Sequence, residues 1–268
     1  MKINRRNLLL GGAVATAAPG LAGLLSSSTG IELPKRRSGG PSLWQNLGGR
    51  LPDLPSLQQS HTADICIVGG GYTGLCAAIY LKKMQASLRV MVLESHQLGA
   101  GASTRNSGAV YAKFTGIDDQ SFAEQGLQHF KNFLQSESVD CDFQPANTLY
   151  LYKDDSQRKA AQNNQKTNEQ WITDDKLKRA IASDFYAAAK VGRGFYKLNP
   201  AKLLSEYRRI ALAHGVEIYE NTPVLGVNYQ GSSLDVQTAL ARVSCAKVLL
   251  ATNAYTPRLG QGISGTSI

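Results

Sequence analysis

Three glycine residues in the spacing G-x-G-x-x-G constrain this chain more than any other feature. They are Gly69, Gly71 and Gly74. The residues before them, 64–68, form an apolar, β-branched run that is typical of a buried parallel strand. The residues after them, 75–83, have helical periodicity. The pattern therefore predicts a strand, a tight turn and a helix in direct succession.

In such a unit the three glycines have different tasks. The first permits the turn, the second lets the backbone approach a pyrophosphate, and the third lets the helix pack closely on the strand. The diphosphate then binds N–H groups at the positive end of the helix. The motif thus predicts a dinucleotide site. The other residues of the predicted cofactor-binding turn are Gly70, Tyr72 and Thr73.

An acidic residue stands at the distance expected of a ribose ligand. A second apolar run, residues 89–93, ends at Glu94, twenty residues after Gly74. A carboxylate in this place accepts hydrogen bonds from the ribose of a dinucleotide. Strand, helix and acid together favour dinucleotide binding over an ordinary glycine-rich loop. Ser95, which follows the acid, is included in the predicted site.

A second loop of small residues follows at positions 99–108, Gly-Ala-Gly-Ala-Ser-Thr-Arg-Asn-Ser-Gly. An enzyme that binds only NAD has no need of such a loop, whereas a flavin cofactor runs on past the pyrophosphate. Ser103 is expected to cap a helix, and Arg105 and Asn106 to donate to a phosphate or a flavin ring. An ordinary flexible loop is the alternative. The remaining predicted contacts here are Gly101 and Ala102.

The two glycine-rich segments together resemble the FAD-dependent D-amino-acid oxidase superfamily, in particular the branch of glycine oxidases and gamma-glutamylputrescine oxidoreductases. Residues 199–204 resemble the family's proline-led helix, and residues 248–257 its late strand and turn beside the flavin. The leader Pro-Ser-Leu-Trp at positions 41–44 also fits this branch. The resemblance covers roughly residues 41–260 but is specific only at these short segments.

This resemblance implies FAD as the cofactor and an amine or amino acid as the substrate. The C–N bond is then oxidised by hydride transfer to the flavin, and water hydrolyses the resulting imine. Oxygen or an electron carrier would be the acceptor, and the sequence does not decide between them. An NAD(P)-binding enzyme and an inactive FAD-binding remnant are the alternatives. No catalytic acid or base is assigned.

The resemblance also places three residues at the cofactor. In relatives the segment matching residues 221–224 brings a backbone N–H and C=O to the adenine, so Val224 is assigned to the adenine site. Thr252 and Asn253 lie just past an expected strand at residues 247–251, where ligands bind in parallel sheets. A plain turn is the alternative for these two. Tyr111 and Lys113 are also within expected reach of a flavin or substrate.

The expected fold is α/β, with a Rossmann-like, glutathione-reductase-like FAD-binding domain and an inserted, incomplete α+β substrate domain. The FAD-binding domain is predicted from residues 61–115 and 199–268, and the substrate domain from residues 116–198. Residues 31–60, rich in Pro, Gly and Ser, are expected to be a linker or a surface arm. Further expected helices cover 119–136, 154–170 and 200–214, and expected strands cover 148–152, 216–219, 224–229, 234–238, 242–246 and 247–251.

The first thirty residues have the pattern of a bacterial twin-arginine signal. Arg5 and Arg6 precede three leucines and a weakly hydrophobic run. That run contains Pro19 and four glycines, which makes it a poor membrane-spanning helix. We expect periplasmic export and no stable membrane span after processing. A membrane anchor at this end and a cytoplasmic protein with an ordinary tail are the alternatives.

Composition excludes several other classes. The chain has 268 residues, 43% hydrophobic and 18% charged, as in a globular protein. The signal-like segment contributes three of the nine net positive charges, and no basic stripe interleaved with aromatic residues predicts a nucleic-acid partner. The four cysteines lack C-x-x-C spacing and the four histidines lack ligand spacing, so no metal site is expected. Cys66 and Cys76 are expected to be buried apolar residues.

The family also implies more chain than is present here. After Tyr255 only thirteen residues remain, whereas family members continue substantially further. The chain is therefore expected to be a fragment, or otherwise a truncated relative with altered function.

Overall fold

The computed structural model describes residues 40–48, 51–112, 120–163, 170–258 and 263–264. The described residues from Pro41 onward belong to one compact unit. The predicted signal segment and Lys113 lie outside the described residues. Among the helices described, none combines the length and apolar character that a membrane crossing requires.

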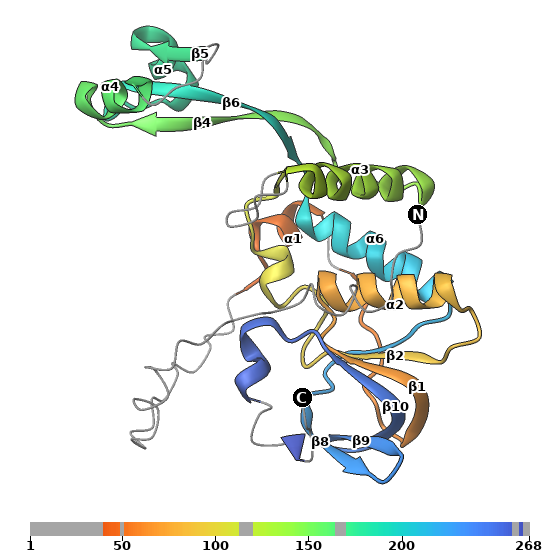
Figure 1. The fold of residues 1–268 in the computed structure, drawn as a ribbon. Coiled ribbons are helices and arrows are strands. Elements are labelled where there is room, and N and C mark those ends of the chain that lie inside the picture. The colour runs from red at the N-terminus through yellow and green to blue at the C-terminus, as the bar shows by residue number, and fades with distance from the viewer. Residues whose placement is uncertain (1–39, 49–50, 113–119, 164–169, 259–262, 265–268) are drawn as a thin grey trace, which may run out of the picture. The chain divides into compact units, whose positions relative to one another are not determined.

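The larger sheet has seven strands in the order β11-β8-β9-β10-β1-β2-β7 (Figure 1). Strands β10, β1, β2 and β7 run parallel, whereas β8, β9 and β10 form an antiparallel meander. The strands are β1 (His61–Val68), β2 (Val90–Leu93), β7 (Glu217–Tyr219), β8 (Val224–Gln230), β9 (Ser233–Thr238), β10 (Arg242–Leu250) and β11 (Ile263–Ser264).

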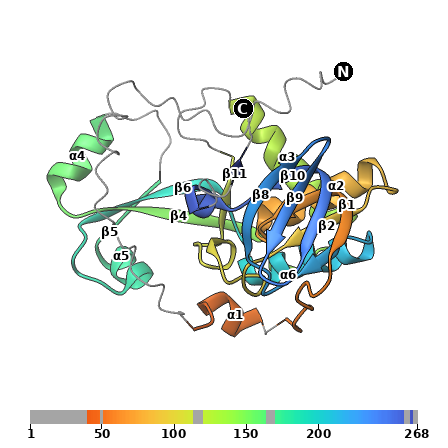
Figure 2. The same cartoon turned by 90° about the horizontal axis from the view of Figure 1, so that it is seen from below.

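The central strands are buried on both faces, which explains their continuous apolar sequence. Helix α2 (Tyr72–Met84) lies against one face, and α6 (Pro200–Ala213) packs on α2 on the same side, as Figures 1 and 2 show. Ile67 and Val92 point into this core. Cys66 and Met91 instead contribute to a second core with the meander. The parallel strands therefore hold their carboxyl ends at a fixed edge, where the glycine turn begins.

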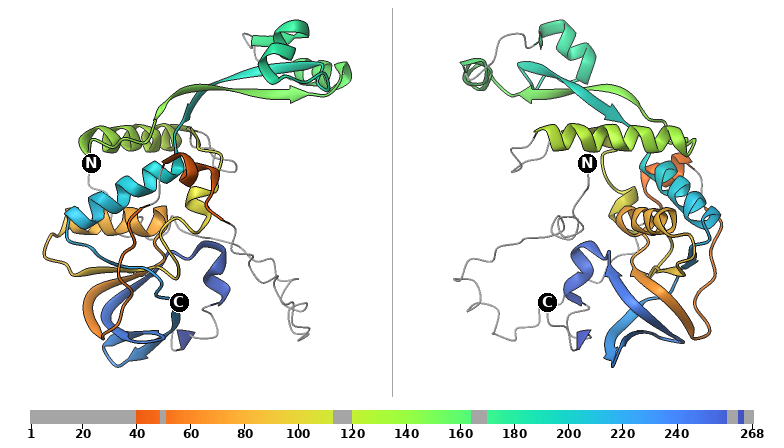
Figure 3. Two further views of the ribbon diagram at one scale, coloured as in Figure 1. Left: turned by 180° about the vertical axis from the view of Figure 1, so that it is seen from behind. Right: turned by 45° about the vertical axis from the view of Figure 1, so that its right-hand side comes forward.

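A second sheet is built from residues between the two stretches that form the first. Strand β6 pairs antiparallel with β3, β4 and β5, and α4 and α5 follow the ends of β4 and β5 (Figure 3). The strands of this sheet and the helices between them are, in chain order, β3 (Ala109–Tyr111), α3 (Gln120–Ser136), β4 (Gln144–Tyr152), α4 (Asp155–Asn163), β5 (Gln170–Thr173), α5 (Asp174–Ile181) and β6 (Ala188–Lys197). The chain is therefore an α/β fold with an α+β portion inserted in the sequence, as predicted.

The start of α6 follows from its sequence. Asn199 is the N-cap, and its Oδ1 accepts hydrogen bonds from the N–H groups of Ala201 (2.9 Å) and Lys202 (3.2 Å). Pro200 occupies the first helical position, where its missing N–H costs nothing. The predicted proline-led helix is confirmed.

Two predicted element boundaries are wrong. The expected strands 242–246 and 247–251 are one strand, because β10 keeps its pairing with β1 from Val243 to Leu250. The expected helix 154–170 is α4 alone in its described part, and Gln170 begins β5 because it pairs with Val191 of β6.

The described part of the expected linker is partly structured. Helix α1 (Leu43–Gly48) lies within it, and Leu57 is only 2% exposed in the meander-side core. Ser42 and Gln45 cap α1 reciprocally, since each backbone N–H donates to the other's side chain. These residues therefore pack as part of the unit.

Candidate cofactor site

The glycine turn lies between the end of β1 and the start of α2. Gly69 has a φ of +109°, and a Cβ atom there would lie 2.6 Å from the carbonyl oxygen of Ala251. A Cβ atom at Gly74 would overlap the carbonyl oxygen of Gly69. Gly71 is the N-cap of α2, and its carbonyl accepts from the N–H of Leu75. The turn therefore needs glycine at two positions for its own packing and directs the amino end of α2 to the edge of the sheet.

Glu94 ties this turn to the residues that follow β2. Its Oε2 accepts a hydrogen bond from the Gly70 N–H at 2.8 Å. Its Oε1 accepts from the His96 N–H (3.0 Å) and the Ser95 hydroxyl (3.1 Å). The carboxylate is half-buried and reaches the turn, as its spacing from the glycine motif predicts.

The second loop lies directly beside the first. The Ser103 Oγ accepts a hydrogen bond from the Tyr72 N–H at 3.1 Å, although the two residues are 31 positions apart. A Cβ atom at Gly71 would lie 2.9 Å from the same oxygen. The structure thus brings the two glycine-rich segments together at the start of α2.

The expected N-cap role of Ser103 is wrong. The local helix is a single 3-10 turn, η1 (Ala102–Thr104), and its N-cap is Gly101. Ser103 lies inside this turn, and its hydroxyl bonds across to the first loop instead of to its own helix. A local propensity is overridden here by a contact that is distant in sequence.

The expected donors of the second loop turn toward their own backbone. Asn106 Nδ2 donates to the carbonyl oxygen of Ser103 (2.9 Å), and its Oδ1 accepts from the Gly108 N–H (2.9 Å). Arg105 Nε lies 3.4 Å from the carbonyl oxygen of Ala100. Both side chains are exposed. In this arrangement Asn106 closes the loop through hydrogen bonds to its own backbone.

The residues after β10 lie at the same edge of the sheet. The Ala251 N–H donates to the Val68 carbonyl at 2.8 Å, which places Thr252 directly past the glycine turn. The Thr252 and Thr256 hydroxyls lie 2.7 Å apart. Asn253 has a φ of +50° and begins the 3-10 helix η2 (Asn253–Arg258). The predicted position past a parallel strand is confirmed; the contact with a cofactor stays a prediction.

Val224 is the first residue of β8 and follows a turn that is hydrogen-bonded to Glu94. The Thr222 N–H donates to the Glu94 carbonyl at 2.8 Å. The half-buried Val224 packs against the meander-side core. The structure therefore connects the start of β8 with the acid, although their contact is through Thr222.

Tyr72 contributes to this arrangement through its backbone. Its hydroxyl donates to the Pro200 carbonyl at 2.8 Å, and its ring meets Tyr207 edge-on with centroids 5.8 Å apart. Burial raises the pKa of the Tyr72 hydroxyl. The side chain therefore packs α2 on α6, while the N–H faces the second loop. Thr73, the next residue of α2, is exposed.

Trp44 is a contact of the second loop that the motifs did not reveal. Its Nε1–H donates to the Asn106 carbonyl at 2.8 Å, across 62 positions. The only signal in the sequence was the likeness of positions 41–44 to the family's leader. The tryptophan joins α1 to the loop that carries Ser103.

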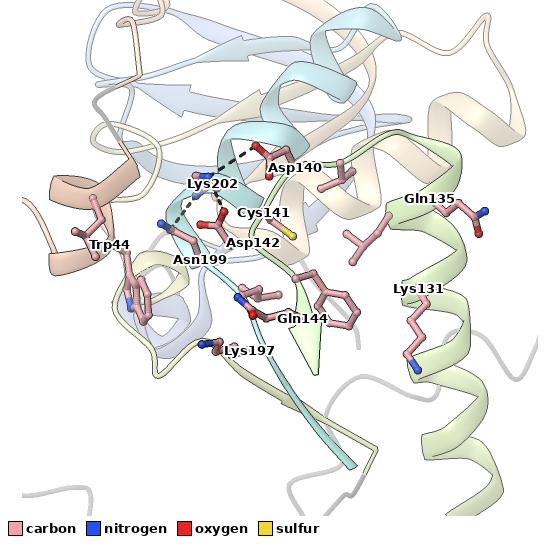
Figure 4. A pocket seen from close by; sticks show the side chains of 15 residues that line it. Trp44, Lys131, Gln135, Asp140, Cys141, Asp142, Gln144, Lys197, Asn199 and Lys202 are labelled. Carbon is pink, nitrogen blue, oxygen red and sulfur yellow. Dashed lines mark hydrogen bonds and ion pairs between the residues drawn. The ribbon is translucent and has the colours of Figure 1, made fainter. Parts of the chain in front are cut away.

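A hollow of about 930 Å³ lies elsewhere, lined by residues of α1, α3, α6 and the segments around β4 and β6 (Figure 4). None of the predicted cofactor residues lines it. Lys202 on its wall is paired with Asp142 (2.7 Å) and Asp140 (3.7 Å). Burial, with Asp140 nearby, raises the pKa of the Cys141 thiol to about 11. The hollow is therefore not lined by the glycine turn, and Lys202, which lies in α6, is paired with carboxylates.

Among the residues that the structure describes, no group of cysteine, histidine or acidic side chains is arranged to bind a metal ion. All four cysteines are free thiols. Cys66 is buried as expected, whereas Cys76 is only half-buried because it sits at the edge of the α2 core face. The Cys66 thiol is hydrogen-bonded to Cys245, which raises the pKa of Cys66 and lowers that of Cys245.

The family comparison agrees with this geometry, in which an acid and a second loop are held against a strand, a glycine turn and a helix. The model described as "DAO: FAD dependent oxidoreductase" matches residues 64–268. The chain belongs to this family of FAD-dependent oxidoreductases. The predicted family and cofactor, FAD, are thereby confirmed.

Individual members of the FAD-dependent oxidoreductase family share modest identity with the chain. Gamma-glutamylputrescine oxidoreductase of Escherichia coli (strain K12) is 28% identical over 222 residues, which are 75% of this chain and 51% of that protein. Sarcosine oxidase subunit beta of Rhodobacter capsulatus is 24% identical, over 75% of this chain and 52% of that protein. The chain thus spans about half the length of these relatives.

A solved structure from the same kind of enzyme also resembles this fold. The crystal structure of glycine oxidase from Geobacillus kaustophilus superposes with a TM-score of 0.64 at 20% sequence identity. The match covers 76% of this chain and 58% of that one. The chain therefore has a fold similar to that of this solved structure.

Proposed function

We propose that this chain holds FAD across its two glycine-rich loops, as part of an oxidoreductase that oxidises the C–N bond of an amine or amino acid. The observation that carries the proposal is the contact between Ser103 Oγ and the Tyr72 N–H, which joins the loops at the amino end of α2. A single dinucleotide loop would serve NAD equally well. Two adjoining loops favour a cofactor that extends beyond its diphosphate.

The residues of this site fit FAD in a defined way. The N–H groups at the start of α2 bind the diphosphate, where the helix dipole favours negative charge. Glu94 accepts hydrogen bonds from the ribose, and the backbone of Val224 meets the adenine. Loop 99–108 and residues Thr252 and Asn253 flank the flavin end.

When bound, FAD supplies the acceptor for the hydride that leaves the substrate carbon. The protein's part is to orient the cofactor and to shape its surroundings. No residue of the chain is assigned as acid or base. Water then hydrolyses the imine product.

The substrate class rests on relatives. Gamma-glutamylputrescine oxidoreductase, sarcosine oxidase subunit beta and glycine oxidase are each named for an amine or amino acid. The chain spans about half the length of the two curated relatives, and the reaction is proposed for the protein as a whole.

The direct test is the flavin content of the purified chain. We expect a yellow protein with flavin absorbance approaching one equivalent per chain. Turnover is then measured with glycine, sarcosine and gamma-glutamylputrescine, by peroxide release in air and by dye reduction without oxygen. Peroxide release indicates an oxidase, and dye reduction alone a dehydrogenase. A folded chain that binds NAD but takes up no flavin would contradict the proposal.

We further propose export through the twin-arginine route, as Arg5 and Arg6 indicate. A protein that folds around its flavin in the cytoplasm suits a route for folded cargo. Changing Arg5→Lys together with Arg6→Lys is expected to retain the protein inside the cell, measured by fractionation. If the double variant is exported as well as the wild type, the two arginines do not act as a twin-arginine signal.

A further inference from the structure

A buried carboxylate joins three segments that are far apart in the sequence. Glu220 follows β7 and is only 2% exposed. Its Oε1 accepts a hydrogen bond from the Leu98 N–H at 2.7 Å, and its Oε2 accepts from the Leu54 N–H at 2.9 Å. Its own N–H donates to the Pro55 carbonyl at 3.0 Å. The burial of this carboxylate is tolerable because both oxygens have donors.

The same turn holds the loop that carries Glu94. The Thr222 N–H donates to the Glu94 carbonyl (2.8 Å), and the Asn221 N–H donates to the His96 carbonyl (2.9 Å). With the Glu220–Leu98 bond, three contacts fix residues 94–98 from one side. On the other side the Glu94 carboxylate accepts from the Gly70 N–H. Glu94 is therefore clamped between the Glu220 turn and the glycine turn.

Residues 53–57, here called the strap, complete the clamp. The Leu57 N–H donates to Thr222 Oγ1 at 3.0 Å, and Gln97 Nε2 donates to Asp53 Oδ1 at 2.7 Å. Leu57 anchors the strap in the core. The strap has no helix or strand of its own, because its backbone partners lie in the Glu220 turn.

We propose that Glu220 is a positioning residue of the FAD site, which sets the Glu94 carboxylate against the glycine turn by fixing residues 94–98 and the strap. This inference rests on the proposed function. Only a carboxylate can accept from both N–H groups. A glutamine of the same shape would accept from one and turn its own NH₂ toward the other. The loop of residues 94–98 would then lose one of its hydrogen bonds, and the position of Glu94 would no longer be fixed.

A double-mutant cycle on the full chain tests this role. The dissociation constant of FAD is measured by flavin fluorescence for wild type, Glu220→Gln, Glu94→Gln and the double variant. Each single change is expected to raise it roughly tenfold, and the double change hardly further, because Glu220 acts through Glu94. Fully additive effects, about a hundredfold in the double variant, would overturn the proposal.

The matched control is Glu217→Gln, which removes a carboxylate whose side chain is 45% exposed three positions earlier in β7. It is expected to leave FAD affinity unchanged, and an equal loss would overturn a specific role for Glu220. Should Glu220→Gln fail to fold, Glu220→Asp takes its place in the cycle. It keeps the charge but is too short to reach both N–H groups.

Amide hydrogen exchange without FAD separates this proposal from the proposed function. In Glu220→Gln the amides of Leu54, Leu98 and Gly70 are expected to exchange faster, while those of α3 keep their rates. Unchanged exchange at Leu98 and Gly70, or a uniform increase across the chain, would overturn the positioning role. Failure of the wild type to bind FAD would instead refute the proposed function, and the exchange result would still decide the role of Glu220.

Discussion

The glycines of the two glycine-rich loops are of two kinds, because some leave no room for a side chain and others leave open space. In the first, Gly69 and Gly74 leave no space for a side chain, because backbone carbonyls of the chain itself lie there. In the second, Gly108 is likewise confined, because its φ is +70° and a Cβ atom would lie 2.4 Å from the Leu198 carbonyl oxygen. By contrast, among the described residues beyond its chain neighbours, nothing lies within 4 Å of a Cβ atom placed at Gly101. Folding therefore requires the confined glycines of both loops, whereas the space at Gly101 is open to a ligand. The difference teaches that a glycine pattern alone does not separate folding from binding.

Gly74→Ala is the change expected to have the largest effect. The new Cβ would overlap the Gly69 carbonyl oxygen, and the backbone fixes the positions of both atoms, so neither can rotate away. We expect a loss of at least about 3 kcal/mol in the free energy of unfolding, which outweighs the ~1 kcal/mol gained in helix propensity. Thermal unfolding followed by circular dichroism measures it.

Gly126→Ala is the matched control for this change. Gly126 also lies inside a helix, α3, and beyond that helix's own backbone no described residue comes within 4 Å of a Cβ atom placed there. It is expected to gain about 0.5–1 kcal/mol. Equal responses of the two variants would mean that the close approach at Gly74 does not govern the fold.

The parts of the molecule that the sequence predicted are those with local signals. The strand, turn and helix around Gly69 follow from spacing and periodicity, and α6 follows from the Asn199-Pro200 cap. The role of Ser103 was missed because its partner, Tyr72, is 31 positions away. The strap was read as a linker because its hydrogen bonds go to Glu220 and Thr222, which no local pattern records.

Gly71→Val tests binding at the first loop with little effect on folding. Gly71 has φ −78° and ψ −172°, which valine readily adopts, and its close neighbour is the rotatable Ser103 hydroxyl. The side chain would block the approach of the diphosphate. We expect FAD affinity to fall by about a hundredfold, or about 2.7 kcal/mol. Equilibrium unfolding should change by no more than about 1 kcal/mol.

Flavin absorbance per chain after gel filtration is the measurement. A variant that retains its flavin would show that the diphosphate does not approach Gly71. If the variant unfolds, packing requires glycine at position 71, as it does at Gly69 and Gly74.

Ser103→Ala breaks the contact between the loops. It removes the acceptor of the Tyr72 N–H, and a neutral hydrogen bond of this kind contributes about 1 kcal/mol. We expect FAD affinity to fall about fivefold as the loops lose their common anchor. Fluorescence titration measures the effect, and Ser103→Thr, which keeps the hydroxyl, is the control. If both variants bind FAD as tightly as wild type, the contact does not organise the site.

Gly101→Ala is the smallest change and separates the two loops most sharply. Gly101 has φ −88° and ψ −160°, which alanine adopts without strain, and beyond the adjacent residues the new methyl group contacts nothing in the part of the chain that the structure describes. The free energy of unfolding should therefore stay within about 0.5 kcal/mol of wild type. If FAD passes over this loop, the methyl group occupies space that the cofactor uses, and affinity should fall about threefold. Stability and affinity would then respond separately at Gly101 and together at Gly74. An unchanged affinity would remove Gly101 from the site and leave α2 and Glu94 as the main cofactor contacts.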